Sequence, residues 1–303
     1  MAVEIIEEPY TKEQILGILN RIKYPLADPN ALPEPTLETL REIQYRCVTS
    51  IPFETLSLRT TKSRGVDISL QGIYDRVVNN HRGGWCFSLN RLGFELLKAI
   101  GFKVQFTLAR VCKPLKYGDP IVFGSLSHRI TIVRFEDGTK YAFDIGFGNT
   151  PYYPLQLKDG ASIEYFGHRR RLVKTVHNRA TPEILGNPVE ELWSMEEHLG
   201  EDKWIPCYAF SEQQFYDADC EVGNFNANYS PRSTFFTAFW CVQGSLDGTI
   251  YLLVGKEMKI KTAAGVQQVI PIEKEQDRLD VLEKYFGIIL TEEELMYHDQ
   301  KLE

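Results

Sequence analysis

The sequence predicts an α+β protein in which a helical N-terminal part is followed by antiparallel strands. Over about the first 100 residues apolar side chains recur at helical spacing, and from Lys103 the period changes towards two. The last third mixes helix-like and strand-like stretches. Because a single hydrophobic core stops growing near ~250–300 residues, a chain of 303 residues suggests two or three domains.

The N-terminal part is expected to hold four helices. Thr11 and Gln14 form a capping box before the first helix, which ends at Pro25. A proline-containing linker leads to a second helix, whose apolar side is Leu37, Leu40, Ile43 and Cys47. Ser69 caps a third helix. The fourth follows Cys86, because apolar residues recur at Leu89, Leu92, Leu96, Leu97 and Ile100.

Antiparallel strands dominate the rest of the chain. In the middle third they are expected over residues 103–112, 128–136, 139–145 and 172–177, with Asp137-Gly138 as a hairpin turn. Residues 113–127 read as a long loop rich in Gly, Pro and Ser, of a kind that is usually functional or mobile. In the last third we expect strands over 234–243, 249–254, 257–262 and 267–270, and helices over 211–216, 275–286 and 291–296.

Composition and charge limit the class of protein. The chain is 43% hydrophobic and 25% charged, and its formal net charge of -7 argues against nucleic acid as a partner. The basic cluster Arg169-Arg170-Arg171 is expected on a solvated surface. No apolar run approaches the ~18–20 residues of a membrane span, and the acidic N-terminus does not resemble a signal peptide. We therefore expect a cytoplasmic protein without membrane contact.

Cys86 differs in its surroundings from the other five of the six cysteines. None of the six forms a Cys-x-x-Cys pair, so free thiols are expected, with neither a zinc site nor a redox pair. Cys86 follows two glycines and opens a helix, where unpaired N–H groups and the helix dipole favour a thiolate. The glycines let backbone or ligand approach closely. A cysteine that only fills a core needs none of these features.

A cysteine nucleophile needs a base, and the base needs an orienting acceptor. His128 opens an apolar strand, and Asp144 lies in the partner strand among Phe, Ile and Gly, where an unpaired carboxylate is costly. The two share a sheet face if a three-residue turn pairs Phe135 with Thr139 and leaves the turn glycine left-handed. We predict this longer turn or an equivalent bulge. A two-residue turn, which pairs Glu136 with Thr139, also gives attractive apolar pairs, so the register stays open.

Each of these residues has an ordinary explanation when it is taken singly. A lone cysteine is more often a core residue, a strand histidine is more often structural, and an aspartate before Ile-Gly is often a turn former. Together, with the thiol at a helix start, they favour a Cys/His/Asp nucleophilic site. The other histidines (81, 168, 177, 198 and 298) lack comparable settings and show no metal-ligand spacing, so no metal is expected.

The motifs around these residues resemble those of the arylamine N-acetyltransferases. The segment Arg82-Gly83-Gly84-Trp85-Cys86 with Asn90 is similar to the family signature around its nucleophile, and Ile51-Pro52-Phe53-Glu54 with Leu56 to its upstream Pro-Phe-Glu element. The segments Ser127-His128 and Asp144-Ile145-Gly146-Phe147-Gly148 resemble the histidine and aspartate motifs, and Ser230-Pro231-Arg232-Ser233 resembles a Ser-Pro-x-Ser element near the cofactor. The similarity runs from about Thr11 to about Gly287.

The resemblance implies a papain-like cysteine-enzyme core of a helical bundle plus an antiparallel β-barrel, with a C-terminal α/β domain. The ranges are 1–102 for the helical domain with the nucleophile, 103–205 for the barrel with His and Asp, and 206–303 for the α/β lid domain. It also implies ping-pong transfer of an acetyl group from acetyl-CoA to the nitrogen of an arylamine or arylhydrazine. Cys86 would carry the acyl group as a thioester, with His128 as general base and Asp144 as its orienter.

The resemblance extends to contact residues for both substrates. Cofactor contacts are implied for Gly124, Ser125, Arg232 and Ser233, although family members often have a different residue at Arg232. Candidates for the acceptor site are Phe53, Phe87, Phe123, Ser127 and Phe147, of which the phenylalanines can equally be plain core residues.

Three alternatives remain open from the sequence. The donor can be another acyl-CoA such as malonyl-CoA, whose carboxylate would need a cation near the thiol. Arg82 and Arg129 are candidates, although structural ion pairing is the commoner role. The same triad also serves cysteine hydrolases of the protease or transglutaminase type, and a catalytically inactive binding protein can share the scaffold. The physiological amine and the oligomeric state are not indicated.

Overall fold

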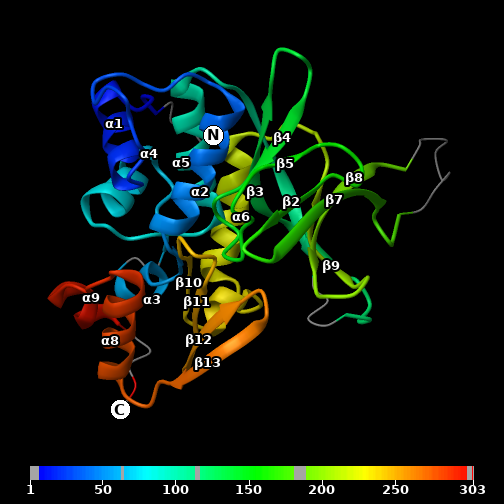
Figure 1. The fold of residues 1–303 in the computed structure, drawn as a ribbon. Coiled ribbons are helices and arrows are strands. Elements are labelled where there is room, and N and C mark those ends of the chain that lie inside the picture. Colours follow the sequence, from blue (N-terminus) through cyan, green and yellow to red (C-terminus); the bar gives the residue numbers. More distant parts are fainter. Residues whose placement is uncertain (1–6, 63–64, 113–116, 181–188, 299–301, 303) are drawn as a thin grey trace.

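The computed structural model describes residues 7–62, 65–112, 117–180, 189–298 and 302. Figure 1 shows three parts: helices from the N-terminal third, an eight-stranded antiparallel sheet, and a five-stranded sheet with helices near the C-terminus. This is the α+β arrangement that the sequence predicts. In the described part of the chain, no helix is both long and apolar enough to cross a membrane.

The N-terminal part contains the predicted helices. These are α1 (Lys12–Arg21), α2 (Leu37–Ser50), α4 (Leu70–Tyr74) with its π-helical continuation η1 (Asp75–Asn79), and α5 (Cys86–Ile100), with the single turn α3 (Ser57–Thr60) between them. Both predicted caps are confirmed, because Thr11 and Gln14 form a capping box and Ser69 Oγ accepts a hydrogen bond from the N–H of Gly72 at 3.1 Å.

Helix α5 is the central helix of this part and carries Cys86 at its first position. Its apolar side chains share one core with α1, α2 and the end of β4, through residues that include Ile15, Leu19, Leu40, Ile43, Leu89, Leu92, Leu96 and Phe143. Near its start, Cys86 and Asn90 also contact β3 of the following sheet, through the carbonyl oxygens of Ser127 and Arg129. The nucleophile candidate is therefore held on a rigid element at the boundary between the helices and the eight-stranded sheet.

The eight-stranded sheet has the strand order β5-β4-β3-β2-β9-β8-β7-β6. Its strands are β2 (Lys103–Cys112), β3 (Phe123–Arg134), β4 (Lys140–Phe143), β5 (Leu155–Gln156), β6 (Ser162–Tyr165), β7 (His168–Val176), β8 (Glu191–His198) and β9 (Trp204–Phe210). The sheet curls until edge strand β5 contacts β6 and β7, which nearly closes a barrel. Its apolar core includes Ile130, Ile132, Leu172, Met195 and Phe210.

The five-stranded sheet joins distant parts of the chain. Its order is β1 (Phe53–Glu54), β10 (Trp240–Gly244), β11 (Ile250–Val254), β12 (Glu257–Thr262) and β13 (Gly265–Pro271). Helices α6 (Asp217–Tyr229) and α7 (Thr234–Thr237) lie between the barrel and this sheet in the chain, and α8 (Glu275–Phe286) and α9 (Glu292–Tyr297) follow it. Residues of α8 cover one sheet face, which carries Cys241, Leu253 and Met258. The opposite face of this sheet lines part of the site described below.

The hairpin between β3 and β4 adopts the longer turn that the sequence favours. Thr131 lies opposite Phe143, and Arg134 lies opposite Lys140. Phe135 donates its N–H to Thr139 O at 2.9 Å, and Gly138 is left-handed with φ +85°. The predicted register is confirmed, and it places His128 and Asp144 on one face.

Two predicted boundaries in the middle of the chain are wrong. Strand β3 begins at Phe123 rather than at 128, because Phe123 pairs with Cys112 of β2, so the long loop is shorter than predicted. Its residues 113–116 lie outside the described part of the chain. Strands β5, β6, β8 and β9 were not predicted, and β7 begins four residues earlier than expected, at His168. The predicted domain boundary at 205/206 falls within β9, and the division into 1–102, 103–205 and 206–303 stays a prediction.

Two expected elements of the last third are also wrong. Residues 211–216 are not helical, because the carbonyl oxygens of Ser211 and Glu212 accept hydrogen bonds from side chains of β2 at 2.9 and 2.8 Å instead. The helix in this region is α6, which begins at Asp217. The strand expected over 234–243 begins only at Trp240, because Ser233 caps the short helix α7. The other predicted elements of the last third are present within about three residues of their expected bounds.

Candidate active site

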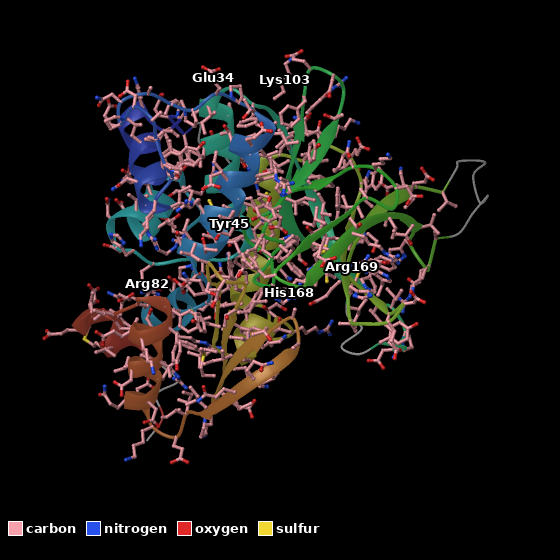
Figure 2. The ribbon with its side chains drawn as sticks, viewed as in Figure 1. Glu34, Tyr45, Arg82, Lys103, His168 and Arg169 are labelled. Carbon is pink, nitrogen blue, oxygen red and sulfur yellow. The ribbon has the colours of Figure 1, made fainter. Side chains whose placement is uncertain are left out.

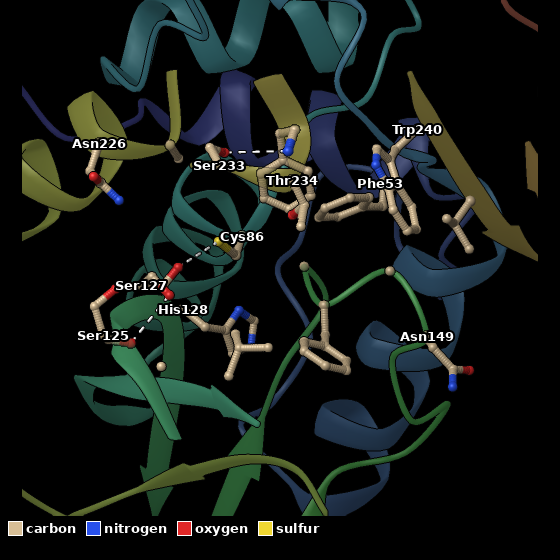
Figure 3. A pocket seen from close by; sticks show the side chains of 18 of the residues that line it. Phe53, Cys86, Ser125, Ser127, His128, Asn149, Asn226, Ser233, Thr234 and Trp240 are labelled. Carbon is tan, nitrogen blue, oxygen red and sulfur yellow. Dashed lines mark hydrogen bonds between the residues drawn. The ribbon is translucent and has the colours of Figure 1, made fainter. Parts of the chain in front are cut away.

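Cys86 is the first residue of α5, at the end of a loop that β1 holds in place. Gly84 forms a parallel bridge with Phe53, and the N–H of Glu54 donates to Gly84 O at 2.9 Å. The Sγ atom of Cys86 points towards the carbonyl oxygen of Ser127, at 3.5 Å (Figure 3). As an N-terminal helix residue, Cys86 has an N–H without an intrahelical acceptor. The thiol is thus fixed beside the strand that carries His128.

A close backbone approach fixes the other side of the thiol. A side-chain carbon at Gly146 would lie 2.8 Å from Cα of Cys86 and 3.0 Å from Nδ2 of Asn90. Such a contact is shorter than non-bonded carbon atoms tolerate. Gly146 therefore lets the Asp144 segment lie directly against the start of α5, which explains the glycine in this motif.

Two arginines near Cys86 make structural ion pairs. Arg82 is buried between Glu54, at 3.2 Å, and Glu294 of α9, and it lies where the N-terminal helices meet the C-terminal ones (Figure 2). Arg129 is buried and pairs with Asp217 of α6 at 2.9 Å. The ion-pairing role favoured by the sequence is confirmed for both.

His128 and Asp144 form a buried pair next to Cys86. The distance from Nε2 of His128 to Oδ2 of Asp144 is 2.8 Å, and both residues are 2% exposed. Burial by itself lowers the pKa of His128, but the Asp144 carboxylate and the contact with Cys86 raise it to about 10. Burial likewise opposes the charge on Asp144, yet His128 and Asn90 hold the pKa of its carboxyl below the usual value. Since Asp144 occupies Nε2, the contact of the imidazole with Cys86 falls to Nδ1.

Asn90 connects α5 to the aspartate segment. Its Nδ2 donates to Oδ1 of Asp144 at 2.8 Å and to the carbonyl oxygen of Arg129, and its Oδ1 accepts from the N–H of Ile145 at 2.8 Å. The N–H of Gly146 supplies a further hydrogen bond to Oδ1 of Asp144, at 2.9 Å. The Asp144 carboxylate is therefore oriented by donors from two elements as well as by the imidazole.

We expect Asn90→Ala to lower the free energy of unfolding by about 2 kcal/mol, because it leaves buried donors and acceptors of the aspartate segment without partners. Urea denaturation followed by circular dichroism measures this change. Lys98→Ala, at an exposed position of the same helix, is the control and should shift stability by less than about 0.5 kcal/mol. Equal losses in the two variants would contradict a specific role for the Asn90 hydrogen bonds.

Aromatic rings enclose the imidazole. The ring centroid of Phe147 lies 5.2 Å from that of His128, and the ring of Tyr208 lies 4.9 Å away. Burial and the nearby Asp144 carboxylate raise the pKa of Tyr208 well above its usual value, so the phenol stays neutral. The rings exclude water from the pair, which strengthens its electrostatic attraction.

The stability of the His128–Asp144 pair should depend on pH. The pKa of His128 is about 10 in the folded protein and about 6.5 when unfolded, so its stabilising contribution is complete below about pH 6.5. It is lost as the pH rises towards 10. We therefore expect the difference in unfolding free energy between wild type and His128→Gln to shrink over this range. Urea denaturation of both proteins at intervals between pH 6 and 10 measures it, and a constant difference would contradict the charge state assigned to the imidazole.

A pocket of about 540 Å³ opens over Cys86 and His128 (Figure 3). Most of the predicted contact residues line it, namely Phe53, Gly124, Ser125, Ser127, Phe147, Arg232 and Ser233. Its lining comes from the barrel, from the segment between α6 and α7, and from the open face of the five-stranded sheet. The pocket thus joins all three parts of the fold at the thiol.

Two predicted contact residues lie elsewhere. Phe87 follows Cys86 by one helical position, about 100° around the axis of α5, and its ring is buried against Gly223 of α6. Phe123 begins β3, and its ring lies 4.8 Å from that of His177. Neither lines the pocket, so both expectations are corrected.

Other lining residues were missed from the sequence. Asn149 follows the aspartate motif directly, and this proximity was a usable signal. Trp240, Ile250, Leu252 and Lys261 lie on strands β10 to β12 and share one face, which becomes visible only when the pairing of β1 with β10 is known. Among the described residues, no cluster of three His, Cys, Asp or Glu side chains is arranged to hold a metal ion.

Comparison with known proteins identifies the family. A sequence profile described as N-acetyltransferase matches residues 36–295. The chain belongs to the arylamine N-acetyltransferase family. A member of this family is an acyl-CoA-dependent N-acyltransferase, and the papain-like fold with a C-terminal α/β domain is the one this family adopts.

Individual relatives cover most of the chain. The N-malonyltransferase FDB2 of Fusarium pseudograminearum is 25% identical over 315 residues, which cover 94% of this chain and 91% of that protein. The arylamine N-acetyltransferase of Mycobacterium tuberculosis H37Rv is 29% identical over 260 residues, 84% of each chain. The solved structure of Mycobacterium marinum arylamine N-acetyltransferase in complex with CoA has a TM-score of 0.73, 25% identity and a coverage of 90% of this chain and 92% of that one.

Proposed function

We propose that this N-acyltransferase moves an acetyl group from acetyl-CoA to the nitrogen of an aromatic amine through a thioester on Cys86. The observation that carries the proposal is the convergence of the Cys86 thiol, the His128 imidazole and the Asp144 carboxylate next to a pocket of about 540 Å³ that Cys86 and His128 line. In this proposal Cys86 is the nucleophile, His128 the general base and acid, and Asp144 the residue that orients and stabilises the imidazolium.

The first half-reaction acylates the thiol. In the resting pair the Sγ proton of Cys86 has already passed to Nδ1 of His128, so a thiolate faces an imidazolium. Sγ attacks the thioester carbonyl, and the carbon–sulfur bond of the donor breaks. Coenzyme A leaves as a thiol with the proton from His128. We propose that the N–H of Cys86, which has no intrahelical acceptor, stabilises the oxyanion that forms during attack. Support comes from the raised pKa of His128, which favours an imidazolium beside the sulfur.

The second half-reaction transfers the acyl group to nitrogen. The amine attacks the acyl-Cys86 carbonyl, His128 takes a proton from the nitrogen, and Sγ leaves. The pocket walls near the thiol are largely aromatic and aliphatic, through Phe53, Phe147, Phe235, Trp240 and Val242. Such walls favour a flat aromatic acceptor and keep water from the thioester, which separates a transferase from a cysteine hydrolase.

The donor is proposed to enter along the polar side of the pocket. Gly124 and Ser125 of β3 and Ser233 at the start of α7 line this side, and the exposed Arg232 lies beside them. A CoA complex of a relative supports the choice of coenzyme. We propose that Arg232 pairs with a phosphate of the donor.

Mass spectrometry of the enzyme after mixing with acetyl-CoA tests the proposal. We expect the peptide that contains Cys86 to gain an acetyl group, and release of coenzyme A beyond one equivalent to require an aromatic amine. Coenzyme A release that continues without amine would favour hydrolysis. The absence of any acyl adduct on Cys86 would contradict the proposed nucleophile.

Malonyl-CoA is the second donor to consider, because the chain is 25% identical to an N-malonyltransferase over 94% of its length. The relative described as an acetyltransferase is 29% identical over 84%. Since these similarities do not separate the two donors, both are offered together in competition. A malonyl adduct that exceeds the acetyl adduct on Cys86 would replace acetyl-CoA as the donor and leave the mechanism unchanged.

A further inference from the structure

The pocket is cationic, although the protein as a whole is acidic. The formal net charge is -7, yet the described residues that line the pocket include Arg232 and Lys261 and no Asp or Glu. Arg232 lies on the side proposed for the donor. Lys261 lies on β12 and has no role in the function proposed so far. A cation in a largely apolar pocket attracts an anionic group on the ligand.

Lys261 is placed at the far edge of the sheet face that lines the pocket. It lies opposite Ile250 of β11, which also lines the pocket. Lys259, two residues earlier on the same strand, does not line the pocket and pairs with Glu257 at 2.7 Å. Among the described carboxylates, none lies within ion-pair distance of the Lys261 ammonium. Lys261 therefore offers a half-buried charge that the protein does not neutralise.

Asn149 lies at the same end of the pocket and is held rigidly. Its Oδ1 accepts from Arg170 at 3.1 Å, and its Nδ2 donates to Glu197 at 2.9 Å. Contrary to the expectation of a solvated cluster, Arg170 is 1% exposed, because it points inwards on β7 and pairs with Glu197 at 3.0 Å. The second Nδ2 hydrogen of Asn149 is left to donate.

His168 connects this end of the pocket to Lys261. It lies at the edge of the barrel that faces the five-stranded sheet (Figure 2), where its Nε2 is 3.3 Å from Gly248 O. Burial, the Arg170 guanidinium and the Lys261 ammonium lower the pKa of His168. A side-chain carbon at Gly167, directly before β7, would lie 2.9 Å from Cβ of Ala263, so the end of β12 that carries Lys261 lies close to the start of β7. Asn149 and Lys261 thus lie beside the same short stretch of β7.

This end of the pocket is separate from the donor side. In Figure 3, Asn149 and Trp240 lie on one side of Cys86, and Asn226, Ser125 and Ser127 lie on the other. The wall between the thiol and Lys261 is apolar, formed by Phe53, Val242, Leu252 and Ile250. An anion bound at Lys261 would therefore belong to the ligand that extends away from the proposed donor side.

We propose that Lys261 and Asn149 form an anion subsite for a carboxylate on the aromatic amine, remote from its nitrogen. The inference rests on the proposed function and names the acceptor as an acidic arylamine. Strands β1 and β12 are three strand spacings apart, about 14 Å, and the long lysine side chain shortens this span. One aromatic ring that carries its amine and its carboxylate at opposite ends can span the remaining distance between the Cys86 thiol and the Lys261 ammonium. A malonyl carboxylate lies only two bonds beyond the thioester carbon and is too close to the sulfur to reach Lys261.

Equilibrium binding to Cys86→Ser tests the subsite without requiring catalysis. The probes are 4-hydroxybenzoate and its uncharged counterpart 4-methylphenol, neither of which carries an amine. We expect Lys261→Gln to weaken 4-hydroxybenzoate binding about 10-fold and to leave 4-methylphenol binding unchanged, whereas Lys261→Arg retains both. Lys259→Gln is the matched control and should change neither. Equal affinities for 4-hydroxybenzoate in the Lys261→Gln and control proteins would overturn the proposal.

Two further outcomes of these experiments would identify a different source of the anion that Lys261 binds. If Lys261→Gln weakens coenzyme A about 10-fold and spares 4-hydroxybenzoate, Lys261 binds a donor phosphate and the acceptor assignment is wrong. The next outcome concerns Lys261→Gln in the enzyme that retains Cys86. If this substitution slows acylation by malonyl-CoA but not by acetyl-CoA, Lys261 binds the carboxylate of the donor, and the acceptor assignment is again wrong. Failure of Cys86 to acquire any acyl group would refute the proposed function, but the binding result would still decide the subsite.

Discussion

Replacing Cys86 with serine is expected to lower the rate of acyl transfer by at least about 10⁴-fold, the largest effect of any single substitution considered. The hydroxyl of serine is a far weaker acid than a thiol, so His128 cannot hold it as an anion. The side chain is otherwise nearly isosteric, and its packing against Gly146 is preserved. The measurement is coenzyme A release from acetyl-CoA in a single turnover, together with the mass of the peptide that contains residue 86.

A matched cysteine provides the control. Cys207 is a partly buried residue of β9, outside the pocket, and burial of its sulfur raises its pKa to about 12. Cys207→Ser should retain full activity, because a thiol that stays protonated is a poor nucleophile. If Cys207→Ser and Cys86→Ser lose activity equally, or if Cys86→Ser still accumulates an acyl adduct, the nucleophile has been misassigned.

The sequence predicted the catalytic candidates because each carries a local signal. Cys86 follows two glycines at a helix start, and the periodicity that predicts α5 also fixes the position of the thiol. The prediction that His128 and Asp144 lie on the same sheet face followed from the pairing register of the two strands, and the length of a single turn sets this register. These inferences need only short-range chain geometry, and the structure contains that geometry.

The remainder of the pocket could not be predicted because it depends on long-range pairing. Phe53 reaches the pocket since β1 pairs with β10, almost 190 residues later in the chain. That pairing turns one face of β11 and β12 towards the thiol and gives Lys261 its position. No local pattern in the sequence specifies it. The phenylalanine at 87 shows the converse error, because adjacency to Cys86 in the chain does not mean adjacency in the pocket.

The residues that support the candidate triad belong to the same sequence motifs as the triad itself. Asn90 lies four residues after Cys86, one helical turn along α5, and it serves Asp144 rather than the thiol. Arg82 and Glu54 are also motif residues, and their ion pair fixes the loop before Cys86. A motif thus combines candidate reacting groups with groups that hold them, and only the three-dimensional arrangement distinguishes the two.

Replacing Asp144 with asparagine is expected to lower the rate of acylation by about 10³- to 10⁴-fold. The neutral amide cannot stabilise the imidazolium of His128, and its NH₂ group competes with the N–H that His128 directs at this position. Without the carboxylate, the main cause that raises the pKa of His128 to about 10 is removed, and burial then lowers the pKa. The imidazolium therefore deprotonates at lower pH in the variant.

The pH profile of acylation distinguishes this role from a purely structural one. In the wild type, acylation should be maintained as the pH rises to about 9, because His128 stays protonated beside Asp144 until about pH 10. In Asp144→Asn, the residual activity should fall at a lower pH. Asp137→Asn, at the exposed turn of the same hairpin, is the control and should keep the wild-type profile. A residual activity in Asp144→Asn with the same pH dependence as the wild type would mean that the carboxylate does not set the charge of His128, and the imidazole would have to be polarised by its aromatic enclosure and the thiol alone.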